Sequence, residues 1–408
     1  MVQRKPHWPA SLAPATLPTG LPPQQMQAAS GEVVRDINRR VLLNLIRRRQ
    51  PVSRAELSRL SGLQRSTVSL IIEELIEQQW VIEGSTGRLP RGRRPTFLRL
   101  NDRRAVIGID LRPTCITLAL CDVNGRFLAQ EMLTTPRDPD VAIQELEGRL
   151  RRILQQNSDL LFEGVGISLP GRFDPASGKL IFAPNLRWPP CDLRTPIEEI
   201  TGLPVLQENA ANACALSEAW YGENQGVRNL VVITVSEGIG TGLLVNGELA
   251  RGWNNMAGEF GHVPLEPDGP PCGCGRNGCW EAMASNRAAQ RYYSEAANPG
   301  EGPTFTELLS LAEQGDHMAT RALERMAEYL ARGLRMLVAG LAPEVIVIVG
   351  ELTRAWDRFG PVLEAAARQQ VLAGPAPRIM PARDGATARL RGTVALVFLK
   401  DFGPPLAV

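Results

Sequence analysis

The 408-residue sequence lacks any uninterrupted run of about 18 apolar residues, the length that a membrane-spanning helix needs. Its N-terminus also lacks the apolar core of a signal peptide. We therefore expect a cytoplasmic protein with no membrane partner. Lysine is scarce as well, because it occurs only at Lys5, Lys179 and Lys400 and arginine supplies the remaining basic side chains. That bias can reflect genome composition and indicates no function by itself.

Cysteine is not abundant, and its seven positions are unevenly spaced, with three of them between Cys272 and Cys279. An odd number with one tight cluster favours a reducing compartment and a metal site over a disulfide framework. The other four have no partner at metal-ligand spacing and are expected in the core: Cys115, Cys121, Cys191 and Cys214.

The composition is that of a folded protein, with 44% hydrophobic and 22% charged residues, which excludes a disordered or fibrous chain. Single cores stop growing at about 250 to 300 residues, so two or three domains are expected. The net charge of +2 hides an asymmetry, because residues 31–100 hold fourteen arginines against seven acidic residues, whereas residues 101–408 carry about −7. The basic segment is therefore expected to bind a polyanion. Residues 1–30 hold six prolines and predict a disordered leader.

Two helices are predicted at the start of the basic segment. The first has an apolar face that runs from Val34 to Ile46 at helical spacing. The second begins at a capping box formed by Ser53 and Glu56 and ends at Gly62. Its expected inner face consists of Ala55, Leu57 and Leu60.

A third helix follows the turn, and its apolar positions are Val68, Ile71, Ile72, Leu75 and Ile76. Helix, helix, tight turn and helix is the order of a helix-turn-helix, whose last helix enters the major groove of DNA. The N-terminal end of that helix is then free to contact bases and phosphates. The candidate DNA-binding residues there are Gln64, Arg65, Ser66, Thr67 and Ser69.

A β-wing is predicted after the third helix, because residues 80–82 and 96–100 have strand character on either side of a loop at 84–95. The loop holds four further candidate DNA contacts: Arg88, Arg91, Arg93 and Arg94. Arginine is favoured in a narrow A·T minor groove, where the negative potential is concentrated. A solvated linker would carry such charge as well, but the preceding helix-turn-helix favours DNA.

The rest of the chain contains an internal duplication. Predicted strands at 105–111 and 115–121 lead through an Asn124-Gly125 hairpin turn to a third strand that ends near Leu133. The pattern recurs about 125 residues later, with strands and turn at 230–235, 242–245 and 246–247. Two similar α/β lobes that face a cleft are therefore expected, with the loop between the first two strands of each lobe pointing into the cleft.

The most specific motif of this part is Cys272-Gly273-Cys274-Gly275-Arg276-Asn277-Gly278-Cys279-Trp280-Glu281, preceded by Gly258-Glu259-Phe260-Gly261-His262. Supporting motifs are Gly166-Ile167-Ser168-Leu169-Pro170-Gly171, Pro184-Asn185-Leu186, Glu208-Asn209 and residues 345–350. On these motifs, residues 35 to about 400 resemble the ROK family of sugar kinases and sugar-responsive repressors.

The resemblance implies an α/β fold of the duplicated, actin-like (ribonuclease-H-like) two-lobed ATPase type, here preceded by a winged helix-turn-helix domain. Four segments follow from this expectation: the leader at 1–30, the DNA-binding domain at 31–100, a first lobe at 105–222 plus about 386–402, and a second lobe with a zinc loop at 223–385.

A structural zinc ion is expected in the second lobe. Three cysteines at C-x-C-x4-C spacing and a histidine ten residues upstream form a sufficient tetrahedral set, with no open position for catalysis. Buried free cysteines are the alternative, but they would not require the intervening glycines. The resemblance assigns the ligands as His262, Cys272, Cys274 and Cys279.

A sugar site is implied by the same resemblance. Carboxylates, amides and imidazole recognise the fixed hydroxyl groups of a sugar ring, and the family's contact positions correspond here to Asn185, Asn209, Glu259, His262 and Glu281. Taken singly, each of these residues could be an ordinary surface residue.

Kinase activity is not expected. The kinases of the family have an aspartate base directly after the position of Asn209, where this chain has Ala210. Their first phosphate loop has two glycines where this chain has Arg112-Pro113, and proline lacks an N–H for phosphate. Ser236-Glu237 replaces a Gly-Thr pair in the second loop, and Gly350-Glu351 interrupts the glycines on the adenosine side.

We therefore expect a transcriptional regulator of sugar metabolism, acting as a repressor, that binds a double-stranded DNA operator and senses a sugar or sugar derivative. A homodimer or homotetramer is expected, because one head covers too small a site. Two alternatives stay open: an active ATP-dependent sugar kinase with a DNA-binding head, and a regulator controlled by a protein partner. The polar residues Asn209, Glu259 and Glu281 favour a sugar over a protein partner.

Overall fold

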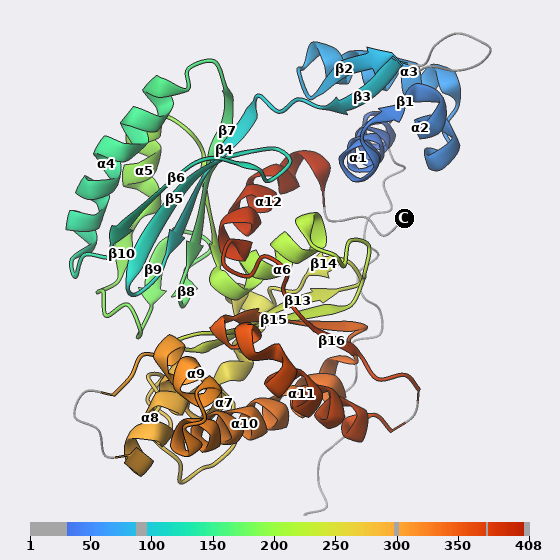
Figure 1. Ribbon diagram of the computed structural model, residues 1–408. Helices are drawn as coiled ribbons and strands as arrows, with labels where there is room; N and C mark the ends of the chain where they lie inside the picture. The colour runs from blue at the N-terminus through green and yellow to red at the C-terminus, as the bar shows by residue number, and fades with distance from the viewer. Residues whose placement is uncertain (1–30, 87–95, 298–301, 373, 404–408) are drawn as a thin grey trace, which may run out of the picture. The chain divides into compact units, whose positions relative to one another are not determined.

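The computed structural model describes residues 31–86, 96–297, 302–372 and 374–403 (Figure 1). The predicted leader at 1–30 and the wing arginines Arg88, Arg91, Arg93 and Arg94 lie outside the described residues. The chain divides into two compact units, residues 1–39 and 40–408. Within the described residues, no helix is long and apolar enough to cross a membrane.

The predicted helix-turn-helix is present as three helices: α1 (Gly31–Arg49), α2 (Arg54–Ser61) and α3 (Arg65–Glu77). Helix α2 begins where the Ser53 hydroxyl accepts a hydrogen bond from the Glu56 amide at 3.2 Å. It ends at Gly62, whose φ of 73° is the left-handed conformation that glycine adopts without steric cost. Three strands complete this part in the antiparallel order β1-β3-β2: β1 (Val52–Ser53), β2 (Val81–Thr86) and β3 (Thr96–Leu100).

Two predicted apolar faces are wrong in part. Of the expected inner face of α2, only Leu57 is buried, because Ala55 lies two residues away on the opposite side of the helix and Leu60 lies at its end, 39% exposed. Helix α1 begins at Gly31, three residues before Val34, and both Val34 and Ile37 are exposed. The buried residues of α1 are Leu42, Leu43, Asn44, Leu45 and Ile46.

The first five-stranded sheet of the following part has the order β11-β7-β4-β5-β6. Strands β4, β5 and β6 are antiparallel neighbours, whereas β7 and β11 run parallel to β4. The predicted Asn124-Gly125 turn joins β5 to β6, with Gly125 at φ 73°. The strands are β4 (Arg104–Leu111), β5 (Cys115–Asp122), β6 (Phe127–Thr134), β7 (Leu161–Leu169) and β11 (Val205–Asn209).

The second five-stranded sheet has the order β16-β15-β12-β13-β14, with the same directions as the first sheet. Asn246 and Gly247, at φ 55° and 85°, form the predicted hairpin turn. This repeated strand order confirms the internal duplication and the two-lobed α/β fold. The strands are β12 (Leu230–Val235), β13 (Ile239–Val245), β14 (Glu248–Leu249), β15 (Val345–Gly350) and β16 (Arg378–Pro381).

Two helices lie between the sheets: α6 (Ala210–Tyr221) and α12 (Ala388–Phe402). Helix α12 packs on β4 and β7 of the first sheet, α6 packs on β12 and β13 of the second, and the two helices contact each other (Figure 1). Strand β12 is buried on both faces, because Val232 belongs to the core that includes these helices and Val231 to the core on the far side.

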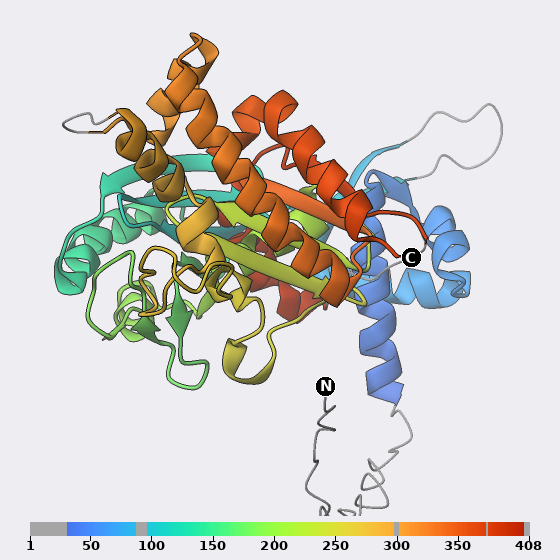
Figure 2. The same cartoon turned by 90° about the horizontal axis from the view of Figure 1, so that it is seen from below.

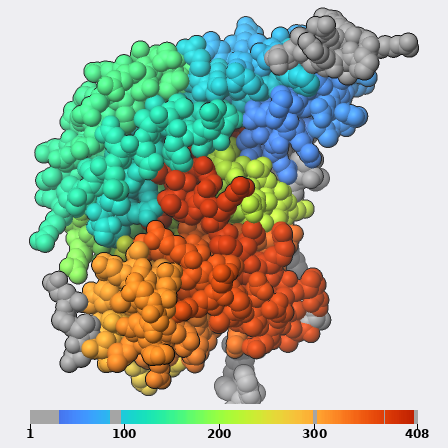
Figure 3. All heavy atoms as spheres, in the orientation of Figure 1, coloured from blue at the N-terminus to red at the C-terminus, as the bar shows by residue number. Residues whose placement is uncertain are grey.

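The remaining helices cover the outer faces of the sheets. Helices α10 (His317–Leu341) and α11 (Trp356–Gln370) lie side by side over the second sheet (Figure 2). Side chains of α8 to α11, in orange, gather into one area of the surface in Figure 3. The other helices are α4 (Pro139–Gln156), α5 (Arg194–Thr201), α7 (Trp280–Ala284), α8 (Asn286–Ala297) and α9 (Phe305–Glu313).

Short elements complete the described residues. A small antiparallel sheet consists of β8 (Arg172–Phe173), β9 (Lys179–Phe182) and β10 (Cys191–Asp192). Single turns of 3-10 helix are η1 (Trp253–Asn255), η2 (Glu259–His262) and η3 (Glu351–Ala355). Below, the head denotes residues 40–100 and the body residues 104–403; the four domain boundaries expected from the sequence stay a prediction.

Candidate functional site

A cavity of about 550 Å³ lies in the body, where the loop after β4, the loop between β12 and β13 and the N-terminal ends of α6 and α12 meet. Pro113 lines it from the first loop and Gly238 from the second, so the corresponding loops of both lobes reach one cavity. All five residues expected to contact a sugar line it as well: Asn185, Asn209, Glu259, His262 and Glu281.

Asn209 lies where strand β11 ends and α6 begins. Its Oδ1 accepts a hydrogen bond from the Ala211 amide at 2.8 Å, which caps the helix, and its Nδ2 donates to the Gly171 carbonyl at 2.9 Å. The preceding Glu208 is 1% exposed and accepts from Arg251 Nε at 2.9 Å and Asn212 Nδ2 at 3.0 Å. This network fixes one wall of the cavity.

Glu281 lines the cavity as well. Its Oε2 accepts a hydrogen bond from the Ile239 amide at 3.1 Å. A Cβ at Gly238 would lie 2.2 Å from the same oxygen, so a larger residue there would displace the Glu281 carboxylate. Asn185 is oriented by Arg287, whose Nη1 donates to Asn185 Oδ1 at 2.6 Å.

Glu259 and His262 share the short helix η2, and Glu259 Oε2 lies 3.9 Å from His262 Nε2. Burial raises the pKa of the Glu259 carboxyl above its ordinary value, and the neighbouring His262 and Arg172 partly offset the shift. A carboxylate and an imidazole are thus held together at the cavity wall, where both can form hydrogen bonds with ligand hydroxyl groups.

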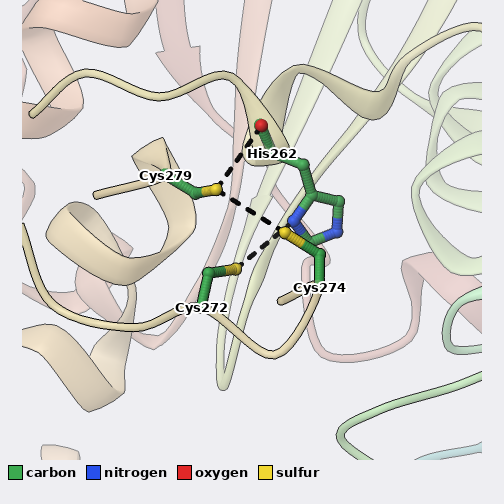
Figure 4. A group of neighbouring side chains, drawn as sticks. All are labelled: His262, Cys272, Cys274 and Cys279. Atoms are coloured by element: carbon green, nitrogen blue, oxygen red, sulfur yellow. Dashed lines mark hydrogen bonds between the residues drawn. The ribbon is translucent and has the colours of Figure 1, made fainter. Parts of the chain in front are cut away.

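The expected metal ligands converge beside this wall. The ligand atoms of His262, Cys272, Cys274 and Cys279 all lie within 4.8 Å of one another (Figure 4). Cys272 Sγ lies 3.5 Å from His262 Nδ1, and Cys274 Sγ lies 3.7 Å from Cys279 Sγ. His262 therefore presents Nδ1 to the cluster and Nε2 to Glu259.

The cluster fits a tetrahedral ion. Zinc–sulfur bonds of about 2.3 Å place two thiolates about 3.8 Å apart on the edge of a tetrahedron, close to the separation found here. Three sulfur ligands and one imidazole nitrogen complete a four-coordinate ion, so no coordination site is left for a substrate or water. The chain can hold the ligands together because Gly278, at φ 60°, passes so close to Glu266 that a Cβ would overlap the Glu266 carbonyl.

The loop after β4 is closed by an ion pair. Asp110 is 1% exposed, and its Oδ2 accepts from Arg112 Nε at 2.6 Å. Burial alone would lower the pKa of Arg112, but the Asp110 charge and hydrogen bond raise it above its ordinary value. A second cation, Arg389 at the start of α12, lies 4.0 Å from Asp110 Oδ1 and lines the cavity. The Asp110 carboxylate is thus neutralised from within the chain.

Three further positions bear on kinase chemistry. Ala210 is the first residue of α6 and lines the cavity without a group that accepts a proton. Glu237 lines the cavity from the loop between β12 and β13. Glu351 follows β15, and its Oε2 accepts from Asn286 Nδ2 at 3.2 Å.

Sequence reasoning missed four residues of the cavity and its network. Arg172 and Arg389 line the cavity, Asn212 does so one turn into α6, and Arg251 pairs with Glu208. Asn212 could have been found from its three-residue spacing after Asn209 on a helix. Arg251 and Arg389 could not, because they reach the site from distant segments and no local pattern marks them.

The predicted DNA contacts lie at the N-terminal end of α3. Gln64, Arg65 and Ser66 are exposed, and Thr67 and Ser69 are half-buried. Opposite them, Val68, Ile71, Ile72 and Leu75 are buried as expected, whereas Ile76, also expected in the core, is half-buried. Leu70, 54% exposed, and Glu73 continue the exposed face and were not singled out from the sequence. The face that α3 leaves open thus includes the predicted contact residues.

Comparison with known proteins places the chain in a family. The model of the ROK family matches residues 106–399. The chain belongs to the ROK family. Among ROK proteins, it is similar to the xylose repressor of Bacillus spizizenii, with 32% identity over 329 residues, which cover 79% of this chain and 84% of the repressor.

Two solved ROK structures are similar over most of their length. A ROK family transcriptional regulator, a homologue of the Escherichia coli MLC protein, covers 91% of this chain and 97% of its own, with a TM-score of 0.77 and 26% identity. The ROK family glucokinase from Streptomyces griseus, in complex with glucose and AMPPNP, covers 72% of this chain and 98% of its own, with a TM-score of 0.65 and 30% identity. The predicted family and fold are therefore confirmed.

Proposed function

We propose that this ROK protein is a sugar-responsive transcriptional repressor. In this proposal the head binds a double-stranded DNA operator through α3, the body binds a sugar or sugar derivative, and the protein works in the cytoplasm with its DNA. The observation that carries the proposal is the convergence of Asn185, Asn209, Glu259, His262 and Glu281 on one cavity in a chain that also has a helix-turn-helix. Similarity to a xylose repressor over 79% of the chain supports it.

The effector that we propose is a neutral aldose or a derivative of one. The candidate side chains offer carboxylate and amide acceptors, amide donors and an imidazole, which suit hydroxyl groups at fixed positions. The names of the relatives direct the first probes to D-xylose and D-glucose. A ligand at 100 times its Kd raises the free energy of unfolding by about 2.7 kcal/mol, so a thermal-shift panel would detect binding.

The decisive experiment measures binding of the full chain to its own upstream region. A duplex of that region should bind more tightly than random duplex, with affinity that falls steeply as salt rises, and the effective sugar should release it. Equal affinity for random duplex at every salt concentration would refute the function. Retained operator binding with no response to any sugar would instead leave a repressor with a different effector.

We also propose that the body does not transfer phosphate. Ala210 cannot accept the sugar proton, and Arg112 already holds the Asp110 carboxylate that begins the first phosphate loop. The second candidate, an active sugar kinase with a DNA-binding head, is favoured by the 30% identity to a glucokinase. A coupled assay of ATP consumption with D-xylose, D-glucose and further aldoses distinguishes the two. Sustained turnover would refute the proposal.

Zinc is the metal that we propose for the four-ligand cluster, in a structural role. His262, Cys272, Cys274 and Cys279 would hold it, and His262 would connect it to Glu259 in the sugar cavity. We further propose a homodimer or homotetramer, because paired heads match the two half-sites of a palindromic operator.

A further inference from the structure

The head and the body share one hydrophobic core. Trp80 of the head lies edge-on to Phe398 and Phe402 of α12, with ring centroids 6.0 and 5.7 Å apart. Phe402 also lies edge-on to Trp220 of α6, at 5.3 Å. Leu42 and Ile46 of α1 belong to the same core. The head therefore packs on the C-terminal ends of α6 and α12.

Two buried polar contacts fix this junction. Arg47 of α1 donates from Nη1 to the Trp220 carbonyl at 2.7 Å, and its guanidinium lies 4.5 Å from the centre of the Trp220 ring. Burial lowers the pKa of Arg47 to about 10. Asn44, 1% exposed, donates from Nδ2 to the Phe402 carbonyl at 2.8 Å. Each carbonyl lies in the last turn of one of the two central helices.

The opposite ends of the same helices line the sugar cavity. Helix α6 contributes Ala210, Ala211 and Asn212 from its first turn, directly after Asn209. Helix α12 contributes Arg389 from its first turn. Helices of 12 and 15 residues are about 18 and 22 Å long, so each spans the distance from the cavity to the head without a break.

Between their ends the two helices are packed too closely to slide independently. A Cβ at Gly392 of α12 would lie 1.9 Å from the Ala213 carbonyl of α6. Ten of the twelve residues of α6 are buried. Interiors packed at this density transmit a displacement instead of absorbing it. A shift at the cavity end is therefore expected at the junction with the head.

We propose that α6 and α12 form a coupled pair that transmits sugar occupancy to the head through the Arg47–Trp220 and Asn44–Phe402 contacts. This inference rests on the proposed function, and it deepens it by naming the route of regulation. A sugar hydrogen-bonded at Asn209 favours one position of the pair, and operator-bound heads favour the other. Because coupling is reciprocal, the operator must weaken sugar binding by the same factor.

A second head–body contact provides a matched control. Gln50 Nε2 donates to Asn124 Oδ1 at 2.7 Å, at the hairpin turn between β5 and β6. Neither residue lines the sugar cavity, and neither belongs to α6 or α12. Asn124→Ala therefore weakens the attachment of the head and leaves the Arg47–Trp220 and Asn44–Phe402 contacts in place.

The experiment compares wild type, Arg47→Met and Asn124→Ala as full chains. Operator affinity is measured with and without saturating D-xylose or D-glucose, and sugar affinity with and without operator. In wild type we expect the sugar to lower operator affinity about tenfold or more, and the operator to lower sugar affinity by the same factor. In Arg47→Met that factor should fall below about twofold, while each affinity measured alone stays within about threefold of wild type. Asn124→Ala should keep the full factor.

Full coupling in a folded Arg47→Met protein would overturn the route, as would equal loss in Asn124→Ala. A second measurement needs neither a sugar nor a stable variant: operator binding to wild type should alter amide hydrogen exchange at 210–214 and 389–392. Unchanged exchange there, with the operator bound, also overturns the route. Failure of the wild-type protein to prefer its upstream duplex refutes the proposed function itself, which is a different outcome.

Discussion

Three carboxylates of the body are each 1% exposed: Asp110, Glu208 and Asp122. The first two accept hydrogen bonds from arginine side chains. Asp122 instead accepts from the backbone amides of Asn124 and Arg126, each at 2.9 Å. A buried carboxylate without close cationic hydrogen bonds loses more hydration than it regains. Burial accordingly raises the pKa of Asp122, and the two amide hydrogen bonds offset only part of the shift.

This shift sets the sign of a stability prediction. An acid whose pKa is higher in the folded state contributes stability below its unfolded pKa and loses it as pH rises through the folded pKa. Asp122→Asn keeps an acceptor for both amides and removes the charge, so it should raise the free energy of unfolding at pH 7 by about 1 kcal/mol.

Urea denaturation of both proteins at pH 7 and pH 5 tests this prediction. The difference in the free energy of unfolding between variant and wild type should be smaller at pH 5, where the wild-type carboxyl binds a proton more readily. A variant less stable than wild type at pH 7 would show that the amide hydrogen bonds outweigh burial.

At the scale of single elements, we propose separate roles for helix α3 and for the loop that carries the four candidate metal ligands. The loop around Cys272 forms one wall of the cavity proposed to bind the sugar, because Cys274, Arg276 and Glu281 all line it. Without an ion, three thiol groups and an imidazole would hold this loop only by weak hydrogen bonds. Order in this loop and ligand affinity should therefore change together.

Metal removal should weaken sugar binding before it affects DNA binding. Treatment with a strong chelator is expected to release about one zinc per chain, lower the melting temperature and reduce sugar affinity at least tenfold. Metal analysis and calorimetry measure these effects, and added zinc should restore both. If metal-free protein bound the sugar with unchanged affinity, order in this loop would have no role in sugar binding.

Arg65, exposed at the first position of α3, is the side chain of this helix that can neutralise a phosphate or bind guanine. Arg65→Ala should weaken operator binding by about 1 to 3 kcal/mol, and if the contact is to phosphate it should reduce the salt slope by about 1. Arg151→Ala, on an exposed turn of α4 in the body, is the matched control. Fluorescence anisotropy across a salt series measures both. Equal effects of the two variants would contradict a DNA-binding role for α3.

Much of the element order was predictable, because hairpin turns and short apolar runs are local properties of the sequence. Strands β3 and β12 have the expected bounds, and both Asn-Gly turns lie where their sequence placed them. The inner face of α2 was not predictable in full, since a helix of eight residues has too few turns to define a face. In the cavity, motif residues converged as expected, whereas Arg389 comes from a helix about 275 residues after the first phosphate loop and carries no local signal.

At the scale of the whole molecule, the proposal depends on two heads acting together. One helix-turn-helix covers half of a palindromic site, and two heads on a symmetric dimer fit half-sites about 34 to 36 Å apart along the DNA. The shared core between head and body limits how far a head can reach. The distance between the two half-sites of the operator should therefore affect binding as strongly as their base sequence does.

Inserting five base pairs between the half-sites of the operator should abolish tight binding, because it rotates one half-site to the other side of the duplex by about half a turn. Inserting ten base pairs returns both half-sites to the same side of the duplex and should recover part of the affinity. Gel-shift titration of the three duplexes tests this. Equal affinity for all three would indicate that heads bind independently, and would contradict the proposed dimer.

The ion pair between Arg112 and Asp110 has a consequence beyond catalysis. A carboxylate that is already paired with an arginine is not free to bind the Mg²⁺ that accompanies a nucleotide, so replacing Ala210 by aspartate alone would not recreate a kinase. In the proposed regulator, gene expression would then follow the abundance of the sugar and be insensitive to swings in the cell's energy supply.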